Sequence, residues 1–239
     1  MKVILCGYNW VGCKALELLL NDGHQVFVFT HTSPSYTNSL EEYCKNKNIG
    51  YSCEKISASL MPFMPDIVAS VYYRFIISDE IIELSGGRIF NLHPSLLPEY
   101  RGCSSLTWAM IEGEHTTGFT YHYLTSEVDK GNIIIQNEIK IEDFDTQISL
   151  YYRVMFEAVE SFLDALKLVA DGFKGTPQEK GRGSYYKRGA PNNGVLTKEW
   201  ERNKIERFIR AMIFPPLPAA QMDGQAIYSL TEWDFILNK

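Results

Sequence analysis

Buried strands and amphipathic helices alternate through the first hundred residues, and this alternation limits the fold more than any other feature of the chain. Apolar runs rich in β-branched residues indicate strands at residues 2–6, 25–30, 66–73 and 88–92. Helical spacing of apolar residues indicates helices at residues 13–22, 39–47 and 78–84. Strands that are separated by helices predict a doubly wound, mostly parallel α/β sheet.

The second half of the chain departs from this alternation. We predict strands at residues 117–123 and 132–141, which follow each other without a helix between them. A long helix is then predicted from Asp145, which would cap it, through Val169, with Gly172 closing it. After this helix the composition shifts toward glycine, proline and basic residues, which indicates a boundary.

The end of the chain is predicted to form a small extension. A helix is expected over residues 197–213 and would end at Pro215 and Pro216. A β-hairpin is expected to follow, because Asp223-Gly224 is a favoured two-residue turn.

The overall composition narrows the class of protein. With 45% apolar and 22% charged residues, the 239-residue chain is ordinary for a globular protein, and we divide it into domains at residues 1–175 and 176–239. A net charge of −6 argues against a nucleic-acid binder, which carries a basic footprint. The five cysteines are scattered without a CxxC pair, so we expect reduced thiols and no metal site. No apolar run reaches the ~20 residues of a membrane span, and none near the start resembles a signal peptide, so we expect a cytoplasmic protein.

The stretch FNLHPSLLPEYRG, from Phe90 to Gly102, joins a predicted strand to a loop that two prolines stiffen. Asn91 and His93 are two residues apart on an extended backbone, so their side chains point to the same side. In open α/β sheets, ligands bind beyond the carboxyl ends of the strands. An amide donor and an imidazole that meet there suit a developing oxyanion and a proton transfer. The alternative is a histidine held in a purely structural hydrogen bond.

Asp129 is the third candidate, in the loop SEVDKG between two predicted strands. A carboxylate near His93 would favour its charged form and hold its orientation. A solvated turn aspartate would have the same spacing, so the residues alone leave both interpretations open.

FNLHPSLLPEYRG followed by SEVDKGNII resembles the folate-dependent formyltransferase family. This family includes glycinamide ribonucleotide, methionyl-tRNA and nucleotide-sugar N-formyltransferases. The resemblance covers residues 1–170 in order and spacing. It implies a formyltransferase-type, doubly wound α/β fold with a small C-terminal helix and β-hairpin extension. It also implies an enzyme that passes a formyl group from 10-formyltetrahydrofolate to a primary amine without a metal.

The resemblance assigns roles to particular residues. Asn91 would polarise the formyl oxygen, His93 would stabilise the tetrahedral intermediate, and Asp129 would support His93 and assist proton transfer. Two segments would bind the folate, one after His93 and one before Asp129. They supply Ser95, Leu96, Leu97, Pro98, Ser126, Glu127 and Val128.

Three observations bear on the amine that is formylated. The turn GYNWVG carries Tyr8 and Trp10, which are too bulky for the phosphate-cradling turn of the purine-pathway relatives. The chain is acidic and has only a short tail after the core, which argues against a tRNA substrate. The tail, with SYYKRGAPNNG and FIRAMIFPPLPAA, resembles nucleotide-sugar N-formyltransferases that act on dTDP-linked 4-amino-4,6-dideoxy sugars.

A nucleotide diphosphate needs cations and flat apolar surfaces. Residues of these types near predicted strand ends and in the tail are the expected substrate contacts: Asn9, Trp10, Tyr73, Arg74, Tyr185, Tyr186, Lys187, Arg188 and Phe214. For each, a core ring or a solvated charge is the ordinary alternative. The similarity to sugar-modifying relatives also implies a homodimer formed through the C-terminal hairpin, with a monomer as the alternative.

The expected reaction is therefore formylation of dTDP-4-amino-4,6-dideoxyglucose, for lipopolysaccharide O-antigen synthesis. Alternatives within the family are a phosphoribosylglycinamide or methionyl-tRNA formyltransferase, or a formyltetrahydrofolate hydrolase in which water replaces the amine. A nucleotide-cofactor oxidoreductase is disfavoured because GYNWVG lacks the central glycine of a dinucleotide-binding turn. A non-catalytic binding module is disfavoured by the presence of Asn91, His93 and Asp129.

Overall fold

The computed structural model describes residues 1–179, 181–215 and 217–237. The chain groups into two compact units, and each is built from three segments. Unit 1 comprises Met1–His93, Thr120–Gln136 and Phe156–Lys180, and unit 2 comprises Pro94–Phe119, Asn137–Met155 and Gly181–Lys239. The predicted division of the chain at residue 175 stays a prediction.

A seven-stranded sheet has the strand order β3-β2-β1-β4-β5-β7-β8. Its strands are β1 (Lys2–Gly7), β2 (Gln25–Phe29), β3 (Tyr51–Ser52), β4 (Ile67–Val71), β5 (Ile89–His93), β7 (Thr116–Tyr123) and β8 (Ile133–Lys140). The strands from β3 to β5 pair in parallel, whereas β7 runs antiparallel to β5. The predicted mostly parallel α/β sheet is therefore confirmed, with an antiparallel strand beside its last parallel one.

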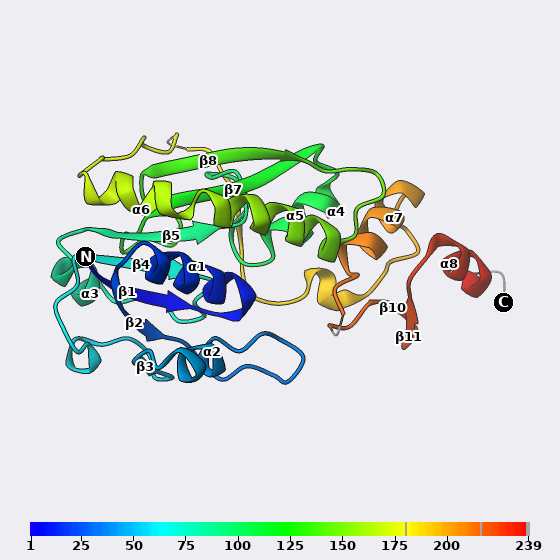
Figure 1. Ribbon diagram of the computed structural model, residues 1–239. Helices are drawn as coiled ribbons and strands as arrows, with labels where there is room; N and C mark the ends of the chain where they lie inside the picture. The colour runs from blue at the N-terminus through cyan, green and yellow to red at the C-terminus, as the bar shows by residue number, and fades with distance from the viewer. Residues whose placement is uncertain (180, 216, 238–239) are drawn as a thin grey trace. The chain divides into compact units, whose positions relative to one another are not determined.

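The helices of unit 1 form where apolar residues repeat at helical spacing. They are α1 (Asn9–Asn21), α2 (Leu40–Lys47), α3 (Asp79–Leu84) and α6 (Phe162–Ala170), with a short 3-10 helix at Ala58–Leu60. Helix α1 contacts β1, β2 and β4 and lies against these strands in Figure 1. It buries Ala15 and Leu19, which are four residues apart and so share one face. Helix α2 begins after Ser39, whose hydroxyl accepts the backbone N–H of Glu42.

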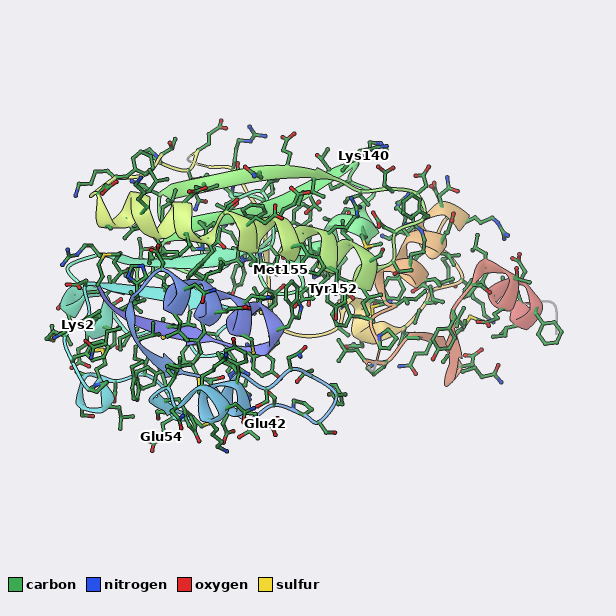
Figure 2. All side chains as sticks on the ribbon, in the orientation of Figure 1. Lys2, Glu42, Glu54, Lys140, Tyr152 and Met155 are labelled. Atoms are coloured by element: carbon green, nitrogen blue, oxygen red, sulfur yellow. The ribbon has the colours of Figure 1, made fainter. Side chains whose placement is uncertain are left out.

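The core of unit 1 is apolar on the strands and on the segments that cover them. One cluster of buried side chains joins Ile4, Cys6, Phe29, Ile56, Val68, Ile77, Ile81 and Ile89. Every residue of β4, IVASV, is buried, as in a strand covered on both faces. Burial of apolar surface stabilises such a core by roughly 25 cal/mol per Å². The charged side chains of Lys2, Glu42 and Glu54 lie on the outside (Figure 2).

The single long helix predicted from Asp145 to Val169 is two helices in the structure. Helix α5 (Gln147–Glu160) ends one residue before Ser161, and α6 follows directly. The N–H of Ser161 lies 3.3 Å from the carbonyl oxygen of Glu157 and 3.2 Å from that of Ala158. The Ser161 hydroxyl also donates to the Glu157 carbonyl at 3.3 Å. Serine bonds of this kind compete with the helical ladder and bend helices, so the break has a local cause.

Unit 2 contains α4 (Ser105–Glu112) and α7 (Arg202–Ala211), which pack against each other. The Arg207 guanidinium donates to the Ile111 carbonyl at 3.1 Å, which ties these two helices together. A two-stranded parallel sheet joins β6 (Arg101–Gly102) to β9 (Tyr185–Tyr186). On the part of α5 that belongs to this unit, Met155 is buried and Tyr152 is exposed (Figure 2).

The tail of unit 2 ends in a hairpin and a helix. Strands β10 (Ala220–Met222) and β11 (Gln225–Ile227) pair antiparallel, which confirms the predicted hairpin. Its turn has φ values of +50° at Asp223 and +78° at Gly224, as a favoured two-residue turn requires. A 3-10 helix at Pro191–Gly194 precedes α7. Helix α7 begins at Arg202, later than the predicted residue 197. Helix α8 (Leu230–Leu237) was not predicted. The predicted helix stop at Pro216 lies outside the described residues. Within the described ranges, no helix is long and apolar enough to cross a membrane.

Candidate active site

Asn91 and His93 lie at the carboxyl end of β5, between β4 and β7. The alternation along the strand puts both side chains on the same face. His93 is 4% exposed, so its imidazole is shielded from bulk water, whereas Asn91 is partly exposed. An amide and an imidazole therefore share a sheltered position at the strand end.

Asp129 lies beside His93. Its Oδ2 atom is 3.5 Å from His93 Nδ1, and the two side chains are 11% and 5% exposed. A carboxylate at this distance favours a hydrogen on Nδ1 and so leaves Nε2 for a reacting group. The backbone of Asp129 has a φ of +53°, in the left-handed region that non-glycine residues enter when a loop requires it. The structure thus brings together the three residues that the resemblance singled out, all within unit 1.

His122, on β7, is a fourth member of the site that the sequence analysis missed. Its Nε2 atom lies 3.4 Å from Asp129 Oδ1 and 3.3 Å from Asn91 Nδ2. Its Nδ1 lies 2.9 Å from the carbonyl oxygen of Tyr123. Ser70, on β4, was missed as well, and its hydroxyl donates to Asn91 Oδ1 at 2.8 Å. The signal for both residues is the pairing of neighbouring strands, since each lies directly across from Asn91.

Contacts from beyond α6 hold the loop that carries Asp129. The Gln178 side-chain amide donates to the carbonyl oxygens of Asp129 and Gly131, both at 2.8 Å. Thr176 forms a β-bridge with Ile133 at the start of β8. Gly131 packs so tightly that a Cβ atom there would lie 1.8 Å from the Tyr123 carbonyl oxygen. The position of Asp129 is therefore set by backbone packing and by two hydrogen bonds from Gln178.

The residues expected to bind folate fall in both units. Ser126, Glu127 and Val128 are exposed in the loop of unit 1 that leads to Asp129. The other segment belongs to unit 2 and comprises Ser95, Leu96, Leu97 and Pro98. Ser95 is buried and donates to the Glu99 carbonyl at 2.7 Å, and Leu97 is buried too. Leu96 and Pro98 are partly exposed.

The expected substrate residues of unit 1 lie after β1 and β4. Asn9 has a φ of +52° and accepts the N–H of Val11 at 2.9 Å, so it starts α1 earlier than predicted. Trp10 packs against Phe156, with ring centroids 4.9 Å apart. The Tyr73 hydroxyl accepts the Ile56 N–H at 2.9 Å, and burial raises the pKa of this phenol.

Arg74 and Phe75 form a cation–π pair beside Tyr73. The Arg74 guanidinium lies over the Phe75 ring at 5.4 Å, and the same ring meets Tyr73 edge-on. This contact orients the guanidinium at the end of β4, where ligands of open sheets bind.

Four of the expected substrate residues of unit 2 lie in or directly after β9, and Phe214 follows α7. Tyr185, Lys187 and Arg188 are exposed. Tyr186 stacks on Trp108 with centroids 4.4 Å apart and on Tyr100 at 5.8 Å. Phe214 meets the ring of Tyr151 edge-on at 5.2 Å. The contacts of Tyr186 and Phe214 pack unit 2 internally, whereas the exposed residues present a ring and two cations to solvent.

The group in unit 1 has the parts that acyl transfer needs. The Asn91 amide can donate an N–H to an oxyanion, the His93 imidazole can move a proton, and the Asp129 carboxylate lies 3.5 Å from that imidazole. Among residues 1–179, 181–215 and 217–237, no group of three or more His, Cys, Asp or Glu side chains is placed to hold a metal ion.

Comparisons with known proteins agree on the family. The formyl transferase family matches residues 11–166. A GDP-perosamine N-formyltransferase of Brucella melitensis is 33% identical over 237 residues, which cover 95% of this chain and 91% of that protein. The solved structure of WlaRD, a sugar 3N-formyl transferase, was determined in the presence of dTDP and 5-N-formyl-THF. It has a TM-score of 0.82 at 23% identity and covers 95% of this chain and 85% of that one.

A second solved structure is an N-formyltransferase from Helicobacter canadensis in complex with folinic acid and dTDP-3-aminofucose. Its TM-score is 0.80 at 22% identity, and the match covers 95% of this chain and 86% of that one. These likenesses confirm the predicted formyltransferase-type fold.

Proposed function

Because the chain belongs to the formyl transferase family, we propose that it is an N-formyltransferase that moves a formyl group from 10-formyltetrahydrofolate to the amine of a nucleotide-linked amino sugar. The observation that carries this proposal is the group of Asn91, His93 and Asp129 in unit 1, in which His93 is buried and Asp129 Oδ2 lies 3.5 Å from His93 Nδ1. A solvated turn aspartate would not be 11% exposed beside an imidazole.

The reaction exchanges one C–N bond for another. The sugar amine attacks the formyl carbon, the bond from that carbon to N10 of the folate breaks, and a proton passes from the amine to the departing nitrogen. Negative charge develops on the formyl oxygen, where the Asn91 N–H stabilises it. His93 adds to that stabilisation and relays the proton, while Asp129 keeps the imidazole in place. The folate supplies only the activated formyl group.

The folate donor is supported by the two solved structures, which contain 5-N-formyl-THF and folinic acid. Two features of the chain suit such a ligand. The loop before Asp129 is exposed, and the Gln178 side-chain amide donates a hydrogen bond to the Asp129 carbonyl at its end. The segment Ser95–Pro98 follows His93 directly in the chain. We propose that these two segments contact the folate.

For the acceptor we propose dTDP-4-amino-4,6-dideoxyglucose, the sugar that the tail of the chain suggests. A second candidate is GDP-perosamine, because the 33% identical Brucella protein carries that name. Both acceptors carry two phosphates, for which Arg74, Lys187 and Arg188 are the proposed partners. The exposed ring of Tyr185 is proposed to stack on the base.

We also propose that the protein forms a homodimer through the β10–β11 hairpin. Short, open two-stranded sheets present unpaired backbone groups that a second copy can cover. The formylated sugar is proposed to enter lipopolysaccharide O-antigen synthesis, and the enzyme is proposed to work in the cytoplasm.

A mass-spectrometric assay tests the proposed function. Purified protein and 10-formyltetrahydrofolate are incubated with dTDP- and GDP-linked 4-amino sugars, dTDP- and UDP-linked 3-amino sugars, and glycinamide ribonucleotide. The expected result is the addition of one CO to a 4-amino nucleotide sugar, at a rate that His93→Asn should lower by roughly 10²–10⁴-fold. Formylation of glycinamide ribonucleotide alone, or release of formate without any acceptor, would overturn the proposed substrate.

A further inference from the structure

Ser70, Asn91 and His122 occupy the same level on three neighbouring strands. Ser70 of β4 lies opposite Asn91 of β5, and Asn91 lies opposite His122 of β7. Side chains that are directly opposite in paired strands stand on one face of the sheet, so these three meet. We call them the polar row. Ser70 is 4% exposed and His122 is 2% exposed, so both ends of the row are buried, while Asn91 between them is partly exposed.

The amide of Asn91 links the two ends of the polar row. The Ser70 hydroxyl donates to Asn91 Oδ1 at 2.8 Å, and Asn91 Nδ2 lies 3.3 Å from His122 Nε2. An amide oxygen can only accept and an amide nitrogen can only donate. The Ser70 hydroxyl donates to the amide oxygen, which leaves the amide nitrogen facing His122. The row therefore gives the amide one orientation.

Both ring nitrogens of His122 face hydrogen-bonding groups. Nδ1 lies 2.9 Å from the carbonyl oxygen of Tyr123. A carbonyl oxygen only accepts, so Nδ1 carries the hydrogen. Nε2 faces two groups, Asn91 Nδ2 at 3.3 Å and Asp129 Oδ1 at 3.4 Å, and it accepts from Asn91 only where it carries no hydrogen toward the carboxylate. With hydrogen on Nδ1 alone, the hydrogen bonds run in one direction, from the Ser70 hydroxyl through Asn91 and His122 to Tyr123.

We propose that Ser70 and His122 are positioning residues that fix the amide plane of Asn91 and keep its remaining Nδ2–H for the formyl oxygen. This inference rests on the proposed function, in which Asn91 stabilises the oxyanion. In this proposal, Ser70 and His122 act through Asn91 and not on the substrate. An asparagine amide has a broad χ2 preference, so an unsupported Asn91 would sample orientations that present its oxygen instead. Donors stabilise a transition state best when they are already oriented.

Kinetics of Ser70→Ala provide the first test. We expect kcat to fall by about tenfold, which is less than the 10²–10³-fold loss expected when an oxyanion donor is removed outright. The KM values of both substrates should change less than about twofold. Ser70→Thr keeps the hydroxyl and should restore most of kcat. Ser85→Ala is the matched control, because Ser85 is 2% exposed in unit 1 and its hydroxyl donates to the Ile82 carbonyl at 2.7 Å. Ser85→Ala should lower Tm as much as Ser70→Ala does and leave kcat unchanged.

A double-mutant cycle and NMR complete the test. In an Asn91→Ala background, Ser70→Ala should cause no further loss of kcat, because the two residues act through one group. Full additivity of the two losses would overturn the proposal. An equal loss of kcat in Ser85→Ala would overturn it as well.

The NMR arm needs no substrate. In ¹⁵N spectra of the wild-type protein, we expect His122 to carry hydrogen on Nδ1 alone and Ser70→Ala to shift the Asn91 side-chain amide resonances. Hydrogen on His122 Nε2 would overturn the proposal. If the wild-type protein formylates no acceptor, the proposed function fails, and these spectra still decide the orientation of the Asn91 amide.

Discussion

Asp129 Oδ2 lies 3.5 Å from His93 Nδ1, and the loop that delivers this carboxylate has a left-handed backbone at Asp129 itself. The carboxylate, the imidazole and the backbone of the loop make separate contributions to the site. Each of them can be changed without changing the other two.

Replacing His93 with asparagine should leave the fold intact and remove proton relay. Asparagine is close to histidine in size and can donate to Asp129, but it cannot take up and release a proton. We expect turnover to fall by roughly 10²–10⁴-fold, the contribution of a positioned acid or base. Product formation is followed by mass spectrometry and folding by circular dichroism. His115→Asn, at an exposed histidine, is the control, and near-normal turnover of His93→Asn would remove His93 from the mechanism.

Replacing Asp129 with asparagine should depress turnover more than folate binding. The amide keeps the size of the side chain but loses the charge that orients His93, whereas the exposed residues before it keep their backbone. Turnover is measured by mass spectrometry, and the Kd for folinic acid by calorimetry. A change in folate affinity alone, with kcat preserved, would show that Asp129 has no catalytic role. Asp143→Asn, at an exposed aspartate, should change neither quantity.

Replacing Gln178 with glutamate should loosen the loop that carries Asp129. Glutamate has the shape of glutamine but presents two acceptors to the carbonyl oxygens of Asp129 and Gly131, where the amide now donates at 2.8 Å. Unsatisfied buried carbonyls cost about 1–3 kcal/mol each, so the loop should move and kcat should fall at least tenfold. Hydrogen exchange of residues 124–131 should become faster. Gln25→Glu, at an exposed glutamine of β2, should leave both measurements unchanged. Unchanged kcat and hydrogen exchange in Gln178→Glu would show that the two Gln178 hydrogen bonds do not hold the loop.

Replacing Gly131 with alanine should destabilise the protein more than the same change at Gly23. A Cβ at Gly131 would lie 1.8 Å from the backbone oxygen of Tyr123, so a strand must shift. Gly23 has a φ of +75° but no atom within 4 Å of an added Cβ. We expect a loss of about 1–2 kcal/mol at Gly23, from the left-handed backbone, and a loss of about 3 kcal/mol or more at Gly131. Urea unfolding measures both, and equal losses would contradict the packing of Gly131.

Much of the fold could be predicted because it depends on local patterns. Continuous apolar runs mark strands buried on both faces, and β1, β2, β4 and β5 all lie within two residues of their predicted bounds. Asn91 and His93 could be paired from their spacing on one strand. The loop of Asp129 could be linked to them only through the family resemblance, because no local rule places a loop against a strand that ends 36 residues earlier.

Ser70 and His122 could not be found in this way. Ser70 sits within the apolar run IVASV and reads as a small core residue. His122 sits in an alternating strand, TTGFTYHY, whose register against β5 is a tertiary property. A one-residue slip would have turned His122 to the other face of the sheet. The break at Ser161 was missed for a related reason, since apolar spacing continues through it and only a hydrogen bond at the end of α5 marks it.

Stability should fall in alkali as unfolded thiols ionise. Burial raises the pKa of Cys13 to about 11 and, with neighbouring charges, that of Cys44 to about 12, from an ordinary value of 9.0. The unfolded state therefore loses these protons first, so the free energy of unfolding should be constant below pH 9 and decrease as pH rises toward 11 and 12. Thermal melts from pH 7 to 10.5 measure the slope. Cys13→Ser should make the slope shallower, and an unchanged slope would show that this thiol does not contribute.

The antiparallel strand β7 also bears on how the protein is made. Residues 1–93 contain the whole parallel part of the sheet, with Asn91 and His93 at its last strand. Their partners His122, on β7, and Asp129, in the loop after it, leave the ribosome later. Gln178, which donates to the Asp129 carbonyl, leaves later still. The nascent chain therefore carries an open, apolar β5 edge for tens of residues of translation before β7 can cover it. A pause in synthesis before residue 124 would leave that edge available to pair with a neighbouring chain. The segment that completes the candidate active site is therefore also the one that covers the β5 edge against misassembly.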